Sequence, residues 1–203
     1  MSHKPDEVTT PKPGAGSFAP HPAGQFAALC VDVINFGEKV GSYEGGPEKL
    51  SPKVGLVFRT GELNDKGEVV DIAREFTNSM HENAALRAFL EQWRGRSFTA
   101  EEVDKGAPLH KLCGVPALVT VEHKPSKDRV YGNLKGISPL PKQMAGAAPK
   151  ADGYERPKYL EERKAKYAEE AAKFRASINA PKSGNDGYEG FPPEPEGEEE
   201  MPF

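Results

Sequence analysis

The chain has 203 residues, of which 36% are hydrophobic and 19 are proline, and its mean hydropathy is −0.65. Such a polar chain predicts one ordinary domain with segments outside its core. No stretch has the length of a membrane-spanning helix, and residues 1–23 lack the apolar run of a signal peptide, so we expect a cytoplasmic protein without membrane contact.

The N-terminal third of the chain predicts an arm followed by a strand and a loop. Residues 1–23 are rich in Pro, Thr and Gly and predict a flexible arm. The apolar run at 24–34 predicts a buried first strand. A Gly- and Pro-rich loop is expected at 41–52, with Tyr43 exposed at its middle.

Two strands joined by a tight turn follow. Alternation predicts a second strand at 53–60 and a third at 68–77, with the turn at 64–67. In the second strand, Val54, Leu56 and Phe58 are expected to lie on one face. In the third strand, the residues expected on one face are Val70, Ile72, Arg74 and Phe76.

A helical region separates these strands from two later ones. Apolar residues at three- and four-residue spacing predict a helix at 82–93, and a capping box at 99–102 opens a short second helix. Strands are expected at 115–123 and 129–138. Three strands, a helical insert and two strands are the elements of a mainly β, five-stranded OB-type Greek-key barrel, with a β-sandwich as the alternative.

The remaining chain predicts appendages to this domain, which spans 24–142. Residues 143–156 are typical of a linker, and 157–178 of a helix that covers the barrel or contacts another copy of the chain. Residues 179–203 predict a disordered tail, whose final part, 187–203, carries 6 Glu and no basic residue.

Enzyme and metal chemistry find little support. His81-Glu82 begins a zinc-protease pattern, but Ala85 stands where its second His belongs. Cys30 and Cys113 lie in apolar contexts and are expected to be reduced core thiols. We therefore expect no catalytic residue, no metal and no cofactor.

The last six residues form an acidic tip, listed as Glu198, Glu199, Glu200, Met201, Pro202 and Phe203. Acids before an apolar residue, a proline and a Phe resemble the acidic C-terminal tip of bacterial single-stranded DNA-binding proteins. The resemblance implies that the tip docks on partner proteins of replication or recombination.

A second resemblance covers the domain. The run at 76–96, with His81-Glu82 and Leu86 to Trp93, looks like the strand-to-helix region of phage-encoded single-stranded DNA-binding proteins with an OB fold, and 131–141 looks like their closing strand. It implies binding of single-stranded DNA without sequence preference, in DNA replication, recombination or repair. A strand-annealing protein and a phage adaptor that binds no DNA are the alternatives.

Single-stranded DNA binding needs aromatic faces for bases and cations for phosphates. The candidate aromatic residues are Phe36, Tyr43, Phe58, Phe76 and Tyr131. The candidate cations are Lys39, Lys53, Arg59, Arg74, Lys124, Lys127, Arg129 and Lys135. Phe58 and Phe76 share faces with other apolar residues, so burial in the core is an equal alternative for them.

Overall fold

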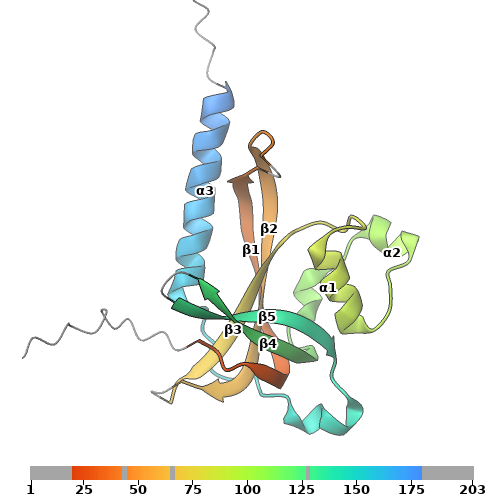
Figure 1. The fold of residues 1–203 in the computed structure, drawn as a ribbon. Coiled ribbons are helices and arrows are strands. Elements are labelled where there is room, and N and C mark those ends of the chain that lie inside the picture. The colour runs from red at the N-terminus through yellow and green to blue at the C-terminus, as the bar shows by residue number, and fades with distance from the viewer. Residues whose placement is uncertain (1–19, 43–44, 65–66, 127–128, 180–203) are drawn as a thin grey trace, which may run out of the picture.

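The computed structural model describes residues 20–42, 45–64, 67–126 and 129–179, and its strands form one five-stranded antiparallel sheet in the order β3-β2-β1-β4-β5 (Figure 1). The strands are β1 (Gly24–Gly41), β2 (Lys49–Leu63), β3 (Val69–Thr77), β4 (Pro116–Ser126) and β5 (Arg129–Pro139). Between β3 and β4 lie α1 (Ala85–Arg94), α2 (Ala100–Lys105) and η1 (Leu109–Leu112). After β5 come η2 (Lys142–Ala147) and α3 (Lys158–Asn179). The expected mainly β fold, with five strands and a C-terminal helix, is confirmed.

The sheet is open and strongly bent, and β1 belongs to both of its halves. Residues 29–41 of β1 pair with β2, and residues 24–29 pair with β4. The edge strands β3 and β5 approach each other, where the guanidinium of Arg74 donates to the backbone oxygens of Leu134 and Lys135 at 2.8 and 3.3 Å. Within the described residues, a side chain rather than a backbone ladder joins these two edges.

The first two strands are longer than the sequence indicates. The first strand was expected to end at 34, but β1 continues through a bulge at 35–37, where Gly37 has a φ of 76°, and β2 already begins inside the expected loop at 41–52. The last residue of β3, Thr77, pairs with Lys53 of β2. The preceding residue of β2, Pro52, pairs with Glu38 of β1. Since β2 has a neighbour on only one side there, a residue without an N–H is tolerated.

The inner face of the sheet carries the main core, which α1 covers. Val54, Leu56 and Phe58 lie together in this core, as alternation predicted, and Ile72 and Phe76 join them from β3. The buried side chains of α1 are Leu86, Phe89, Leu90 and Trp93. The indole Nε1 of Trp93 donates to the carbonyl oxygen of Pro116 at 3.0 Å, which satisfies its one polar atom.

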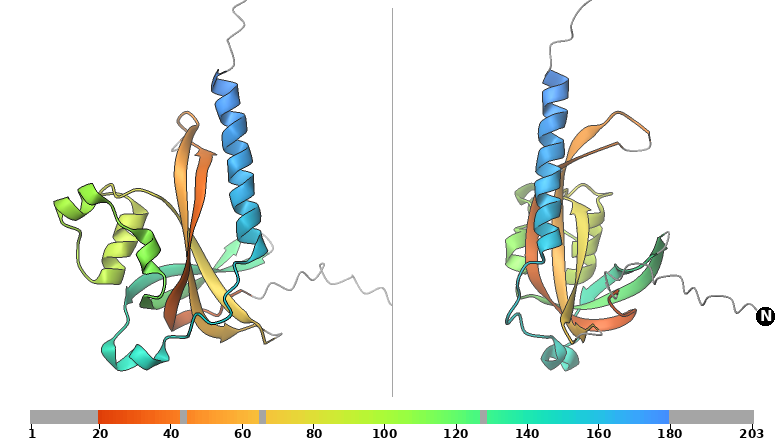
Figure 2. Two further views of the ribbon diagram at one scale, coloured as in Figure 1. Left: turned by 180° about the vertical axis from the view of Figure 1, so that it is seen from behind. Right: turned by 90° about the vertical axis from the view of Figure 1, so that its left-hand side faces the viewer.

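The outer face of the same sheet carries a second core, beneath α3. Ile34, Phe36 and Val57 face outward and pack against Leu160 and Tyr167 of the helix. Figure 2 shows α3 on one side of the β1–β2 hairpin, with α1 and α2 on the other side. The helix expected at 157–178 therefore covers the sheet.

The segment expected as a linker is fixed where it enters α3. Asp32 accepts hydrogen bonds from Arg156 at 2.7 and 2.9 Å and from the hydroxyl of Tyr154 at 2.9 Å. Burial of Asp32 acts to raise the pKa of its carboxyl, but these hydrogen bonds outweigh it and lower the pKa. The helix is thus held at its base by charged groups.

The last residues of the expected N-terminal arm belong to the folded unit. His21 is buried, its Nε2 lies 2.6 Å from the hydroxyl of Thr60, and its backbone oxygen lies 3.0 Å from Nε2 of His123. Gly132 passes so close to His21 that a Cβ there would lie 3.1 Å from its side chain. The folded unit therefore begins before Gly24, whereas residues 1–19 lie outside the described part.

The two cysteines differ in exposure. Cys30 is buried, as expected, and both thiols are free. Cys113 is exposed, which corrects the expectation of a second core thiol, because it follows η1 on the surface. Among the described helices, none combines the length and apolarity that crossing a bilayer requires.

Candidate nucleic-acid interface

Three of the candidate aromatic rings are core residues, which corrects the expectation for Phe36 and agrees with the alternative of burial given for Phe58 and Phe76. Phe58 and Phe76 belong to the inner core, where Phe58 meets Trp93 edge-on with ring centroids 5.2 Å apart. Phe36 lies under α3, with its ring centroid 6.0 Å from that of Tyr167. A base needs a free ring face, and all three side chains are at most 4% exposed.

Two of the expected phosphate-binding cations are structural as well. Arg59 makes a two-pronged ion pair with Asp71 at 3.0 and 3.1 Å and donates to the backbone oxygen of Asp152 at 2.9 Å. Arg74 links β3 to β5, and burial lowers the pKa of its guanidinium. Both guanidinium groups make contacts that hold the fold together.

Lys39 and Lys53 lie on the β1–β2 hairpin. The Nζ of Lys39 lies 5.0 Å from the ring centroid of Tyr167, and the Nζ of Lys53 donates to the hydroxyl of Thr77 at 2.8 Å. Both side chains are partly exposed, so both cations can still reach an anion.

The β4–β5 hairpin brings together three exposed residues of the expected site. Lys124 and Tyr131 are direct cross-strand partners, so their side chains share one face. Tyr131 is 46% exposed and Lys124 is exposed. Lys135 lies on the same strand and pairs with Glu122 at 2.6 Å, with both side chains more than half exposed. Such a solvated pair contributes little and can exchange for a phosphate at low cost.

The same face holds a residue that sequence reasoning missed. Asn133 lies between Tyr131 and Lys135 on the alternation of β5, is exposed, and pairs with Glu122 across the hairpin. Its amide offers donors and an acceptor to a base edge. The period of two along β5 was the signal that could have identified it.

Several expected site residues lie outside what the structure describes. These are Tyr43, Lys127 and the whole acidic tip, 198–203. Arg129 opens β5 and pairs with Ser126 through the backbone.

The position of α3 limits where a nucleic acid can bind. The helix packs on the outer face of β1 and on Val57 of β2 through Leu160 and Tyr167, and Tyr167 donates its hydroxyl to Glu75 of β3 at 3.0 Å. On the β4–β5 hairpin, by contrast, Lys124, Tyr131 and Lys135 are exposed.

No group of three or more His, Cys, Asp and Glu side chains that could hold a metal ion occurs in the described ranges. A scan against protein-family models finds no match for the sequence, and a search of the curated proteins finds none either.

Proposed function

We propose that the protein binds single-stranded DNA without sequence preference, and that it does so through the β4–β5 hairpin. The observation that carries the proposal is the exposed ring of Tyr131 beside Lys124 on a polar strand face. Stacking of one base on such a ring contributes about 1–3 kcal/mol, and lysines add sequence-independent attraction for phosphates.

A single strand suits this surface better than a duplex. An exposed ring needs an unpaired base to stack on, whereas the bases of a duplex are stacked on one another. Lysines are point charges without the two-pronged geometry that reads base edges, so we expect no sequence preference.

The arrangement of the sheet supports an OB-type barrel as part of the proposal. The strand order β3-β2-β1-β4-β5 places β3 and β5 at the two edges, and Arg74 connects them. The helical insert between β3 and β4 packs α1 into the inner core, as the plug helix of such a barrel does.

The wider role that we propose follows from the tail. A protein that coats unwound DNA in replication, recombination or repair must also recruit enzymes. The acidic tip, Glu198 to Phe203, offers an aromatic anchor beside carboxylates for a basic pocket on such a partner. The site of action in this proposal is the cytoplasm, of a bacterial host if the protein belongs to a phage.

The test is a fluorescence-anisotropy titration of the full chain against labelled oligo-dT and a matching duplex across a salt series. We expect Tyr131→Ala to weaken single-strand binding by about 1–3 kcal/mol, or roughly 5- to 150-fold. The matched control is Tyr159→Ala, because Tyr159 is 41% exposed but lies on α3. Lys124→Ala should reduce the slope of log K against log salt by about 0.7.

Two results would refute the proposal. The first is the absence of single-strand binding at low salt, which would favour an adaptor that contacts only proteins. The second is an equal effect of Tyr131→Ala and Tyr159→Ala, which would exclude the β4–β5 hairpin as the DNA surface.

A further inference from the structure

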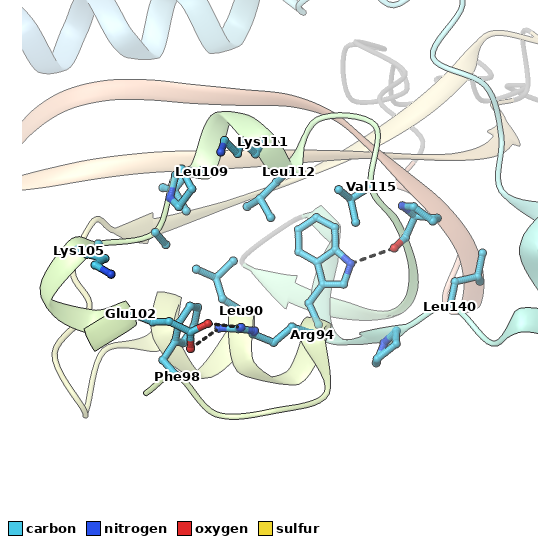
Figure 3. A pocket seen from close by; sticks show the side chains of 16 residues that line it. Leu90, Arg94, Phe98, Glu102, Lys105, Leu109, Lys111, Leu112, Val115 and Leu140 are labelled. Carbon is cyan, nitrogen blue, oxygen red and sulfur yellow. Dashed lines mark hydrogen bonds and ion pairs between the residues drawn. The ribbon is translucent and has the colours of Figure 1, made fainter. Parts of the chain in front are cut away.

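An apolar groove of about 800 Å³ opens between α1, η1 and the start of β4 (Figure 3). Its apolar lining includes Trp93, Phe98, Leu109, Leu112, Val115 and Leu140. This volume lies within the range of about 300–1,000 Å³ that is typical of ligand sites. Val115 is 37% exposed, so apolar surface is left open to water here.

Cations border this groove. Lys105 and Lys111 line it, both are exposed, and the ion pairs of the described residues involve neither of them. Arg94 lies over the ring of Phe98, with its guanidinium carbon 4.3 Å from the ring centroid. The groove therefore offers an apolar floor with a basic rim.

Among the described residues, Glu102 is the one acid that lines the groove, and it is held in ion pairs. Glu102 accepts hydrogen bonds from Arg94 at 2.7 Å and from Arg96 at 2.9 Å. Hydrogen bonds from Arg94, the backbone of Thr99 and Arg96 lower the pKa of Glu102 to about 2. Two arginines thus share one carboxylate, which leaves positive charge in excess at this side of the groove.

We propose that the groove binds the acidic tip of this same chain, residues 198–203. Met201, Pro202 and Phe203 fill the apolar floor, and the carboxylates of Glu198 to Glu200 face Lys105 and Lys111. The tip is complementary to the groove, because its compact apolar end matches the apolar floor and its run of acids matches the basic rim. The inference is independent of DNA binding: the groove shares Pro116 and Pro139 with the base of β4 and β5, but its lining does not include Lys124, Tyr131 or Lys135.

The length of the tail allows this contact. Residues 180–203 can span about 80 Å when fully extended, whereas α3 is about 33 Å long. The chain that follows Asn179 can therefore pass back along α3 and around the sheet to the groove.

Trp93 provides a local probe, because it is the only tryptophan in the chain and it lines the groove. In the full chain, Phe203→Ala should shift the emission of Trp93 to longer wavelength and increase its quenching by acrylamide. The matched control is Phe191→Ala, which removes a ring from the same tail outside the tip. A synthetic peptide of residues 194–203 should restore the emission of the Phe203→Ala protein.

The rim is tested separately from the floor. The double substitution Lys105→Glu and Lys111→Glu changes only exposed side chains, so we expect it to fold, which circular dichroism checks. The double variant should bind the peptide at least tenfold more weakly, and this binding should no longer depend on salt.

A photo-cross-link locates the tip directly. The full-length Phe203→p-benzoylphenylalanine variant should cross-link to residues 105–115 in peptide mass spectra, and mixing isotope-labelled with unlabelled chains tells whether the groove belongs to the same chain. Cross-links confined to other surfaces, or identical Trp93 emission in Phe203→Ala and the unmodified protein, would overturn the proposal even if DNA binding is found.

Discussion

Replacing Arg59 should lower the free energy of unfolding of the protein without altering a DNA contact. The guanidinium of Arg59 and the carboxylate of Asp71 are each only 10% exposed, and they meet through two parallel hydrogen bonds of 3.0 and 3.1 Å. Arg59→Ala removes both bonds and the third one to the backbone oxygen of Asp152. Asp71 then keeps a charge that is shielded from water and has lost its partner.

The magnitude follows from this geometry. Breaking a buried ion pair by removing one member costs about 3–5 kcal/mol, since the remaining charge stays desolvated. Arg59 also lies over the ring of Tyr154, 5.5 Å from its centroid, so packing is lost as well. The matched comparison is Lys135→Ala, which breaks a pair that is 61% and 51% exposed and should cost about 1 kcal/mol or less.

Urea unfolding followed by circular dichroism measures both variants. With a slope of about 2 kcal/mol per molar urea, Arg59→Ala should lower the midpoint by about 1.5–2.5 M and Lys135→Ala by about 0.5 M at most. Arg59→Met combined with Asp71→Leu should recover most of the loss, because no buried charge remains. A loss below 1 kcal/mol for Arg59→Ala would refute the structural role that we assign to this residue.

Three further outcomes follow from other parts of the fold. A Cβ at position 55 would lie 2.6 Å from the ring of Phe36, so Gly55→Ala should cost about 1–3 kcal/mol in the same urea titration, and an unchanged midpoint would contradict that contact. The pKa of Asp32 is lowered in the folded state, so its contribution to stability is present above about pH 4 and is lost as the pH falls through the folded-state pKa. Acid titration should therefore show a smaller loss of stability in Asp32→Asn than in the unmodified chain. Burial raises the pKa of Cys30 to about 12, so iodoacetamide at pH 8 should alkylate the exposed Cys113 and leave Cys30 intact by mass spectrometry, and equal labelling of both would show that the interior opens readily.

Local patterns predicted the strands, the helices and their inner faces. Alternation in β2 assigned Val54, Leu56 and Phe58 to one face because a period of two follows from the backbone of a strand. The capping box at Thr99 and Glu102 is present in full, since it depends on residues only three positions apart. Such features require no knowledge of the rest of the chain.

The candidate site was predicted less well, because exposure depends on distant segments. Phe36 is covered by Tyr167, which follows it by more than a hundred residues, and no local pattern reveals that contact. Arg59 is occupied by Asp71 and by the backbone of Asp152 for the same reason. Tyr131 and Lys124, by contrast, are exposed on the β4–β5 hairpin.

The division of β1 between two halves of the sheet also sets an order of assembly. Its pairing with β2 closes a short connection between Gly41 and Lys49, whereas its first residues, 24–29, pair with residues 116–121. Short connections close faster than long ones, so β1, β2 and β3 are expected to join before β4 arrives. During that interval residues 24–29 of β1 form an unpaired strand edge. A partly folded chain is most exposed to pairing with another chain at this edge.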